Sequence, residues 1–175
     1  MDARKIIPEF DNYLRKEGLV LQATMIGGAA LQLMGLITRP TNDCDILDPM
    51  LDSQILSAAD AYAETQPQLS TGWFNNGPAS LVRTLPGEWS QRLQPLFTGK
   101  AIQLTTLGRE DLLRSKLFAM IDRNIDLPDC VALAPTRDEV LALLPWLNEQ
   151  DGNERWPEHV RDMLQALGGK LGYEL

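Results

Sequence analysis

The feature that most constrains this chain is a pair of glycines that is followed, after a short apolar segment, by two aspartates one residue apart. Residues 20–26 are mostly apolar and predict a strand, and Gly27-Gly28 allow a tight turn into a mostly buried helix over residues 29–36. Arg39-Pro40-Thr41 interrupts the apolar pattern, and residues 42–47 predict a second strand. The sequence thus predicts a strand, a helix and a second strand, with the glycines at the start of the helix and the aspartates on the second strand.

Both ends of this segment carry groups that bind ligands. Backbone N–H groups at a helix start lack internal partners and lie at the positive end of the helix dipole, so they attract anions, and glycines let a phosphate approach closely. On a strand, Asp43 and Asp45 project from one face, whereas Cys44 and Ile46 point to the other. Two parallel carboxylates repel each other unless a cation lies between them. Mg²⁺ suits them, because it typically takes one or two carboxylates together with substrate phosphates.

This arrangement resembles the nucleotidyltransferase superfamily, in which a Gly-Gly or Gly-Ser pair precedes Asp-x-Asp or Asp-x-Glu between apolar residues. Within it, the chain is most similar to small bacterial proteins with Gly-Gly-x-Ala-Leu and then Arg-x-Thr-x-Asp-x-Asp, including relatives of the abortive-infection nucleotidyltransferases of toxin–antitoxin systems. The residues that carry the resemblance are Gly27, Gly28, Ala30, Leu31, Arg39, Thr41, Asp43 and Asp45.

The resemblance implies transfer of a nucleoside monophosphate from an NTP to a hydroxyl acceptor, with Mg²⁺ or Mn²⁺ as cofactor. Asp43 and Asp45 would hold the divalent ions, which lower the barrier by neutralising charge and by orienting the reacting groups. Gly27 and Gly28 would hold the phosphate tail. Arg39 would pair with an acidic group, and Thr41 would contact the ligand or bond only its own turn.

A second region of resemblance runs from Glu110 to Ala119 and continues through Arg123 and Asp126-x-x-Asp129. It is similar to the family's Asp-Leu-Leu-x-x-Lys-Leu-x-Ala helix and its downstream Arg…Asp-x-x-Asp stretch. By this resemblance Lys116 would contact triphosphate oxygens as a compact charge, and Arg123 with Asp126 or Asp129 would order the active site. The alternatives are a solvated lysine on an amphipathic helix and a structural ion-pair network.

The remaining patterns complete a mixed α/β fold. Trp73 and Phe74 lie in a loop, and we expect them to anchor it on the core rather than to stack on a base, because large aromatic side chains usually bury. Helices are expected over residues 3–17, 53–65, 86–97, 109–121, 127–133, 137–147 and 156–167, a loop over 66–78, and strands over 80–85 and 101–106. Strands interleaved with helices predict a nucleotidyltransferase-like mixed β-sheet flanked by helices over residues 1–107, with a helical C-terminal part, 108–175, packed on that core as a single compact unit.

Charge and composition limit the kinds of ligand and partner that the chain is expected to bind. The formal net charge of −8 disfavours bulk nucleic-acid binding and fits an NTP carried with Mg²⁺, or a basic protein partner. No apolar stretch approaches the roughly 20 residues that span a bilayer, and no signal-type apolar core follows the first residues, so we expect a cytoplasmic protein with no membrane partner. Two isolated cysteines and the single His159 predict neither a structural disulfide nor a zinc site.

One departure from the family pattern leaves two functions open. Many active members have a third aspartate on a later strand, whereas residues 81–85 and 102–106 contain no carboxylate, and Glu88 follows a Pro-Gly turn. The first hypothesis is therefore an enzyme with an atypical or absent base. The second is an inactive module that acts as an antitoxin-like or regulatory partner of another protein. A dinucleotide-binding module is less well matched, because Gly27-Gly28 lacks the fuller Gly-x-Gly-x-x-Gly pattern.

Overall fold

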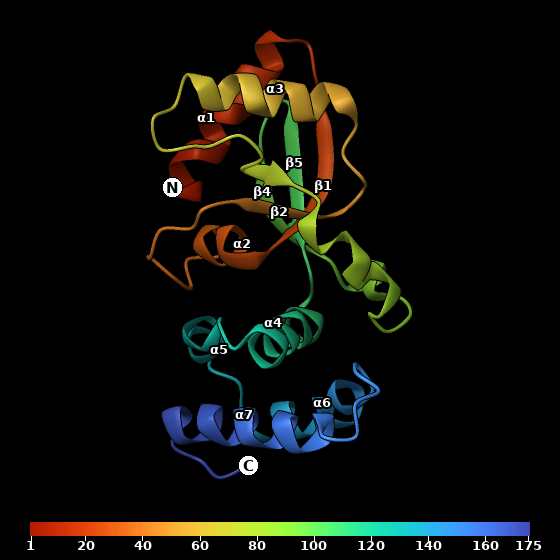
Figure 1. Cartoon of the computed structure of the whole chain (residues 1–175). Helices are drawn as coiled ribbons and strands as arrows, with labels where there is room; N and C mark the ends of the chain where they lie inside the picture. The colour runs from red at the N-terminus through yellow and green to blue at the C-terminus, as the bar shows by residue number, and fades with distance from the viewer. The chain divides into compact units, whose positions relative to one another are not determined.

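A five-stranded mixed sheet in the order β3-β2-β1-β5-β4 forms the centre of the first part of the chain (Figure 1). Strand β1 runs antiparallel to β2 and parallel to β5, β2 is parallel to β3, and β4 is antiparallel to β5. The strands are β1 (Leu21–Ile26), β2 (Cys44–Asp48), β3 (Phe74–Asn75), β4 (Gln94–Thr98) and β5 (Ile102–Thr106). The predicted mixed sheet is thus confirmed.

The computed structural model describes residues 1–175 and divides into two compact units, Met1–Gly108 and Arg109–Leu175. The first unit holds the whole sheet, and the second is built from helices only, so the predicted helical C-terminal part is confirmed (Figure 1). How the second unit packs on the first stays a prediction. No helix is both long enough and apolar enough to cross a membrane.

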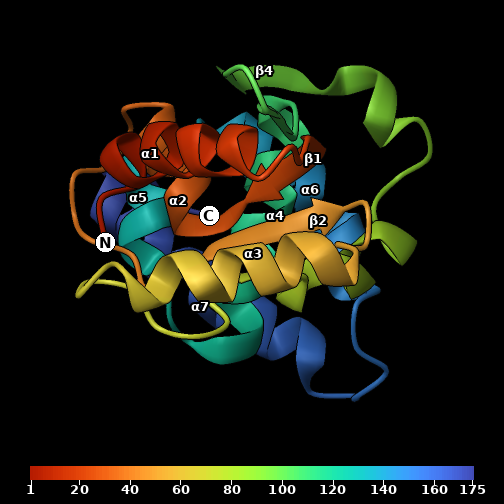
Figure 2. The ribbon, with the colours of Figure 1, turned by 90° about the horizontal axis from the view of Figure 1, so that it is seen from above.

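Helices α1 (Ala3–Lys16) and α3 (Ser53–Glu64) cover one face of the sheet, where they lie side by side (Figures 1 and 2). Between them lies a cluster of aromatic rings, with Phe10 within 5.5 Å of the rings of Trp73 and Phe74. Trp73 and Phe74 are each 1% exposed, so they anchor their loop on the core as predicted and are not available to stack on a base.

A buried carboxylate fixes the turn between β4 and β5. Asp11 of α1 accepts hydrogen bonds from the backbone N–H groups of Lys100 at 3.1 Å, Ala101 at 2.8 Å and Ile102 at 2.7 Å. Burial raises the pKa of Asp11, but the three hydrogen bonds outweigh that effect, and the pKa is lower than its ordinary value. This carboxylate therefore stabilises the fold in its charged form.

The second unit follows its local sequence signals closely. Thr136 caps α6 and forms a capping box with Glu139, as predicted. The end predicted for the last helix was wrong: the helix passes the glycine pair and ends at Leu171, before Gly172. Gly168 lies against the backbone carbonyl of Tyr173, 2.6 Å from where a Cβ would stand, so it allows close packing rather than stopping the helix. The helices are α4 (Arg109–Arg123), α5 (Leu127–Leu133), α6 (Arg137–Asn148) and α7 (Trp156–Leu171).

Predictions for residues 77–98 were mostly wrong. The expected strand over residues 80–85 is a 3₁₀ helix, η1 (Gly77–Arg83), which Pro78 favours because its ring fixes φ. The expected helix over residues 86–97 is only a short 3₁₀ turn, η2 (Trp89–Arg92), followed by β4. Two smaller corrections concern the segment over residues 20–36. The first strand begins at Leu21 and leaves Val20 77% exposed, and the helix that follows ends at Leu33, before Leu36, which is 39% exposed.

Candidate functional site

The junction between β1 and α2 (Gly27–Leu33) brings the first glycine against the second aspartate. Ile26, the last residue of β1, pairs with Asp45 of β2. Gly27 follows with φ +78°, a conformation that side chains other than glycine rarely adopt, and a Cβ there would stand 2.5 Å from Oδ2 of Asp45. The backbone thus meets the carboxylate at a distance that only glycine permits.

The second glycine makes a similar contact with the loop that precedes β2. A Cβ on Gly28 would lie 2.9 Å from Oγ1 of Thr41 and 3.9 Å from Nη2 of Arg39. Thr41 is buried, whereas Arg39 is exposed. The structure therefore brings Gly27, Gly28, Arg39, Thr41 and Asp45 together around the start of α2.

A buried glutamine holds this loop, and the sequence did not single it out. The Gln32 side chain accepts a hydrogen bond from the Ala3 backbone N–H at 2.7 Å and donates one to the Arg39 carbonyl. The Met1 amino group donates to the Thr41 carbonyl, and the Thr41 N–H donates back to the Met1 carbonyl at 3.1 Å. The signal that was available is a polar side chain within the apolar pattern of α2, since Gln32 is fully buried.

The two aspartates flank a buried cysteine. Asp43 immediately precedes β2 and Asp45 lies within it; both are half-buried, whereas Cys44 and Ile46 are fully buried on the core side. Burial, with added repulsion from the charges of Asp45 and Asp43, raises the pKa of the Cys44 thiol well above its ordinary value. The thiol therefore stays protonated and is no candidate nucleophile, while Asp45, its neighbour on the strand, points to the opposite face.

The neighbouring strand adds an amide beside Asp45. In the parallel pair of β2 and β3, Asp45 is matched with Asn75, and Cys44 with Phe74. Asn75 accepts a hydrogen bond from the Gly77 N–H at 2.6 Å and donates one to the Gly72 carbonyl at 3.3 Å. Asn75 was not predicted as a site residue, because it lies in a loop-like stretch whose two-residue strand is defined only by pairing with β2.

The donors present fit a cation that is shared with a ligand. The chain contains no group of three or more His, Cys, Asp or Glu side chains that could hold a metal ion. Asp43 and Asp45 supply two carboxylates, and the Gly27 backbone lies directly beside the Asp45 carboxylate. Such a set suits Mg²⁺ bound by carboxylates and completed by phosphate oxygens and water.

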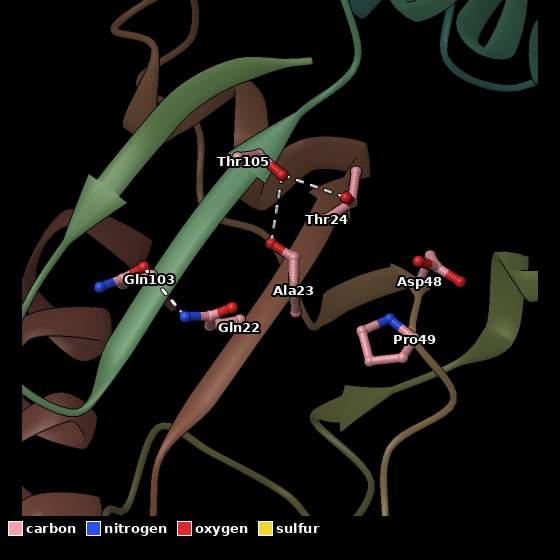
Figure 3. A pocket seen from close by; sticks show the side chains of 7 residues that line it. All are labelled: Gln22, Ala23, Thr24, Asp48, Pro49, Gln103 and Thr105. Atoms are coloured by element: carbon pink, nitrogen blue, oxygen red, sulfur yellow. Dashed lines mark hydrogen bonds between the residues drawn. The ribbon is translucent and has the colours of Figure 1, made fainter. Parts of the chain in front are cut away.

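A cavity of about 250 Å³ is lined by residues of β1 and β5 and by the turn after β2 (Figure 3). Thr24 and Thr105, on these neighbouring strands, are hydrogen-bonded to each other at 3.1 Å, and Gln22 donates to Gln103 at 3.3 Å. Its walls contain no cation, so it lacks the positive charge that would attract a triphosphate. Its lining residues are Gln22, Ala23, Thr24, Asp48, Pro49, Gln103 and Thr105.

The four other predicted residues form a group of their own in the second unit. Lys116 is buried, with Nζ 2.7 Å from Asp129 and 3.7 Å from Asp126, and Arg123 lies 3.2 Å from the same Asp126 oxygen. Asp129 is fully buried, so its charge is balanced chiefly through this network. Lys116 is therefore an ion-pair partner in this structure and not the solvated lysine that was one alternative.

Comparison with known proteins gives one match. The profile of a family described as nucleotidyltransferase of unknown function (DUF6036) covers residues 4–132, which include every residue assigned above to the candidate site. No curated protein and no solved structure matches the chain. Because the profile spans well over half of the 175 residues, the chain belongs to this family of nucleotidyltransferases of unknown function.

Proposed function

We propose that this protein transfers a nucleoside monophosphate from an NTP to a hydroxyl acceptor in a Mg²⁺-dependent reaction. The observation that carries the proposal is the contact of the Gly27 backbone with the Asp45 carboxylate, beside the contact of Gly28 with Thr41. Phosphate and metal would meet at such a place, because the backbone N–H groups there bind the anionic phosphate and the carboxylates bind the metal cation. Membership of a nucleotidyltransferase family supports the same chemistry.

Each residue then has a defined task. Asp43 and Asp45 would hold Mg²⁺, which when bound neutralises phosphate charge and orients the phosphates. Backbone N–H groups at Gly27 and Gly28 would bind the phosphate tail, and Arg39, 3.9 Å from the position of a Gly28 Cβ, would add a positive charge. The acceptor oxygen bonds to the α-phosphorus, the bond to the bridging oxygen breaks, pyrophosphate leaves and the acceptor proton passes to solvent.

For Lys116, Arg123, Asp126 and Asp129 we propose a structural role. A triphosphate contact by Lys116 would require its ammonium group to leave the buried Asp129 carboxylate, 2.7 Å away. Leaving a buried charge without its partner is costly, which favours the ion-pair network over direct ligand binding.

The experiment that tests the function uses purified full-length protein, Mg²⁺, a cell extract and each of the four NTPs in turn. With label on the α-phosphate, we expect a labelled product that the extract alone does not give, and with label on the γ-phosphate we expect no product beyond those of the extract alone. The double variant Asp43→Asn, Asp45→Asn should lose transfer. The matched control Glu17→Gln, Glu64→Gln removes the same charge from exposed positions and should retain it.

The alternative function, an inactive module that binds a protein partner, is favoured by one observation. The strand beside β2 presents Asn75 where a further carboxylate would complete a stronger metal site. An inactive module would add no labelled product to those of the extract alone with any NTP, and its thermal stability would not change with Mg²⁺ and NTP. Transfer that survives in the Asp43→Asn, Asp45→Asn variant would refute the assignment of the site instead.

A further inference from the structure

We infer that Asn75 stands in the place of a third carboxylate, so that the site binds metal through two carboxylates in this chain and through three once Asn75 is changed to aspartate. The inference rests on the proposed function, since it concerns the same metal site. It also places the position of the third carboxylate on β3. The sequence had suggested the stretches 81–85 and 102–106 for this position.

The register of β2 and β3 puts both side chains on one face. Residues matched across a parallel pair point the same way, and Asp45 is matched with Asn75. The preceding pair, Cys44 and Phe74, is buried in the core at 0% and 1% exposure, whereas Asp45 and Asn75 are both half-buried. Asp45 and Asn75 therefore share the face away from the core.

The turn after β3 brings the two oxygens toward the same point. A Cβ on Gly77 would lie 2.8 Å from Oδ1 of Asn75 and 3.8 Å from Oδ1 of Asp45. The other oxygen of Asp45, Oδ2, faces Gly27. Gly27 thus lies beside one oxygen of Asp45, and Gly77 lies near the other oxygen and beside the Asn75 oxygen.

The chemistry of an amide explains how asparagine at position 75 differs from aspartate as a metal ligand. A carboxamide oxygen is neutral, so it attracts a divalent cation less than a carboxylate does, and affinity at oxygen sites rises with the charge of the ligands. An amide also takes no proton near neutral pH and cannot act as a general base. Asparagine and aspartate have nearly the same shape, and an aspartate keeps the acceptor for the Gly77 N–H.

The test is a Mn²⁺ titration of the full-length chain by calorimetry, without nucleotide. For Asn75→Asp we expect the dissociation constant for Mn²⁺ to fall about tenfold relative to wild type, because one more charged oxygen joins the site. The matched control is Gln103→Asp, which adds the same charge on β5. Gln103 is exposed and pairs with Gln22, four residues before Ile26, so at a strand rise of about 3.3 Å per residue it lies roughly 13 Å away along the sheet.

A second variant keeps the test informative if Asn75→Asp folds poorly, since aspartate loses the bond to the Gly72 carbonyl. Asn75→Ser should keep the wild-type Mn²⁺ affinity within about twofold, because a neutral oxygen contributes little. An unchanged affinity in Asn75→Asp, an equal gain in Gln103→Asp, or a loss of about tenfold or more in Asn75→Ser would each overturn the inference.

The same titrations separate this inference from the proposed function. The proposed function predicts that Asp43→Asn, Asp45→Asn weakens Mn²⁺ binding relative to wild type. The inference predicts in addition that Asn75→Asp binds Mn²⁺ more tightly than wild type. Equal binding by wild type and the double variant would count against both the function and the inference, whereas wild-type binding that depends on Asp43 and Asp45, with no gain in Asn75→Asp, would overturn the inference alone.

Discussion

Replacing Gly27 by alanine should destabilise β1 and disturb the candidate site at the same time. Two costs add. Alanine at φ +78° costs about 1 kcal/mol through its left-handed backbone. Its Cβ would also stand 2.5 Å from Oδ2 of Asp45, and relieving such an overlap costs about 2 kcal/mol. The expected total is about 3 kcal/mol.

Gly35 provides the matched control. Its φ is +75°, nearly that of Gly27, but nothing lies within 4 Å of its Cβ position. Gly35→Ala should therefore cost only about 1 kcal/mol, the backbone term alone. The effect of alanine on the unfolded chain is common to both variants and cancels in the comparison.

The assay is hydrogen–deuterium exchange of the peptide that covers β1, which reports the opening of this strand separately from the second unit. In an Asp45→Ala background, the cost of Gly27→Ala should fall to that of Gly35→Ala, which gives a coupling of about 2 kcal/mol between the two positions. Equal costs for Gly27→Ala and Gly35→Ala in the wild-type background would refute the close contact on which the site is built.

Three further predictions concern charged groups outside the candidate site. Asp11→Ala leaves three backbone N–H groups without their acceptor and should lower the stability of the first unit by about 3 kcal/mol in urea unfolding. The pKa of Asp11 is lower in the folded state than its ordinary value of 3.8. The stability that Asp11 contributes is therefore present above pH 3.8 and is lost as the pH falls through the folded-state pKa. Glu139, which accepts hydrogen bonds from Arg109 and from the backbone of its capping box, has a pKa lowered from 4.5 to about 2. The second unit should therefore lose stability as the pH falls from 4.5 to about 2. In acid titrations followed by circular dichroism, the Glu139→Gln variant should show a smaller loss than wild type over this range. The loss in wild type should be only about 1 kcal/mol, because the Glu139 side chain is 35% exposed and solvent screens its ion pair with Arg109. Lys116→Ala should destabilise the second unit by about 4 kcal/mol, because it removes the ammonium group that lies 2.7 Å from the buried Asp129 carboxylate. Lys116→Met combined with Asp129→Leu should restore most of that loss in thermal melts, and no recovery in the double variant would argue against the structural role.

Local signals explain which parts of the fold the sequence predicted well. Helices α1, α3 and α4 carry continuous apolar stripes, and α6 has a capping box, so their positions follow from residues close together in the chain. The contact between Gly27 and Asp45 also follows from a local arrangement, because only a short helix and a loop separate the two adjacent strands. Gly27 and Asp45 therefore meet.

Features that depend on distant residues escaped prediction. Strand β3 has two residues and no pattern of its own, so the place of Asn75 beside Asp45 is decided by pairing with β2, thirty residues earlier. Lys116 lies on a helix whose periodicity does not show that Asp129 is buried within reach. Gln32 likewise takes its role from Ala3 and Arg39, which no sequence window brings together with it.

The most direct test of the central claim is calorimetric titration of the full-length protein with each NTP in the presence of Mg²⁺. The account predicts that at least one NTP binds wild-type protein with Mg²⁺ and not with EDTA, and that Gly27→Ala and the Asp43→Asn, Asp45→Asn variant lose this binding while Gly35→Ala keeps it. Absence of binding for all four NTPs, or undiminished binding after loss of both carboxylates, would contradict it.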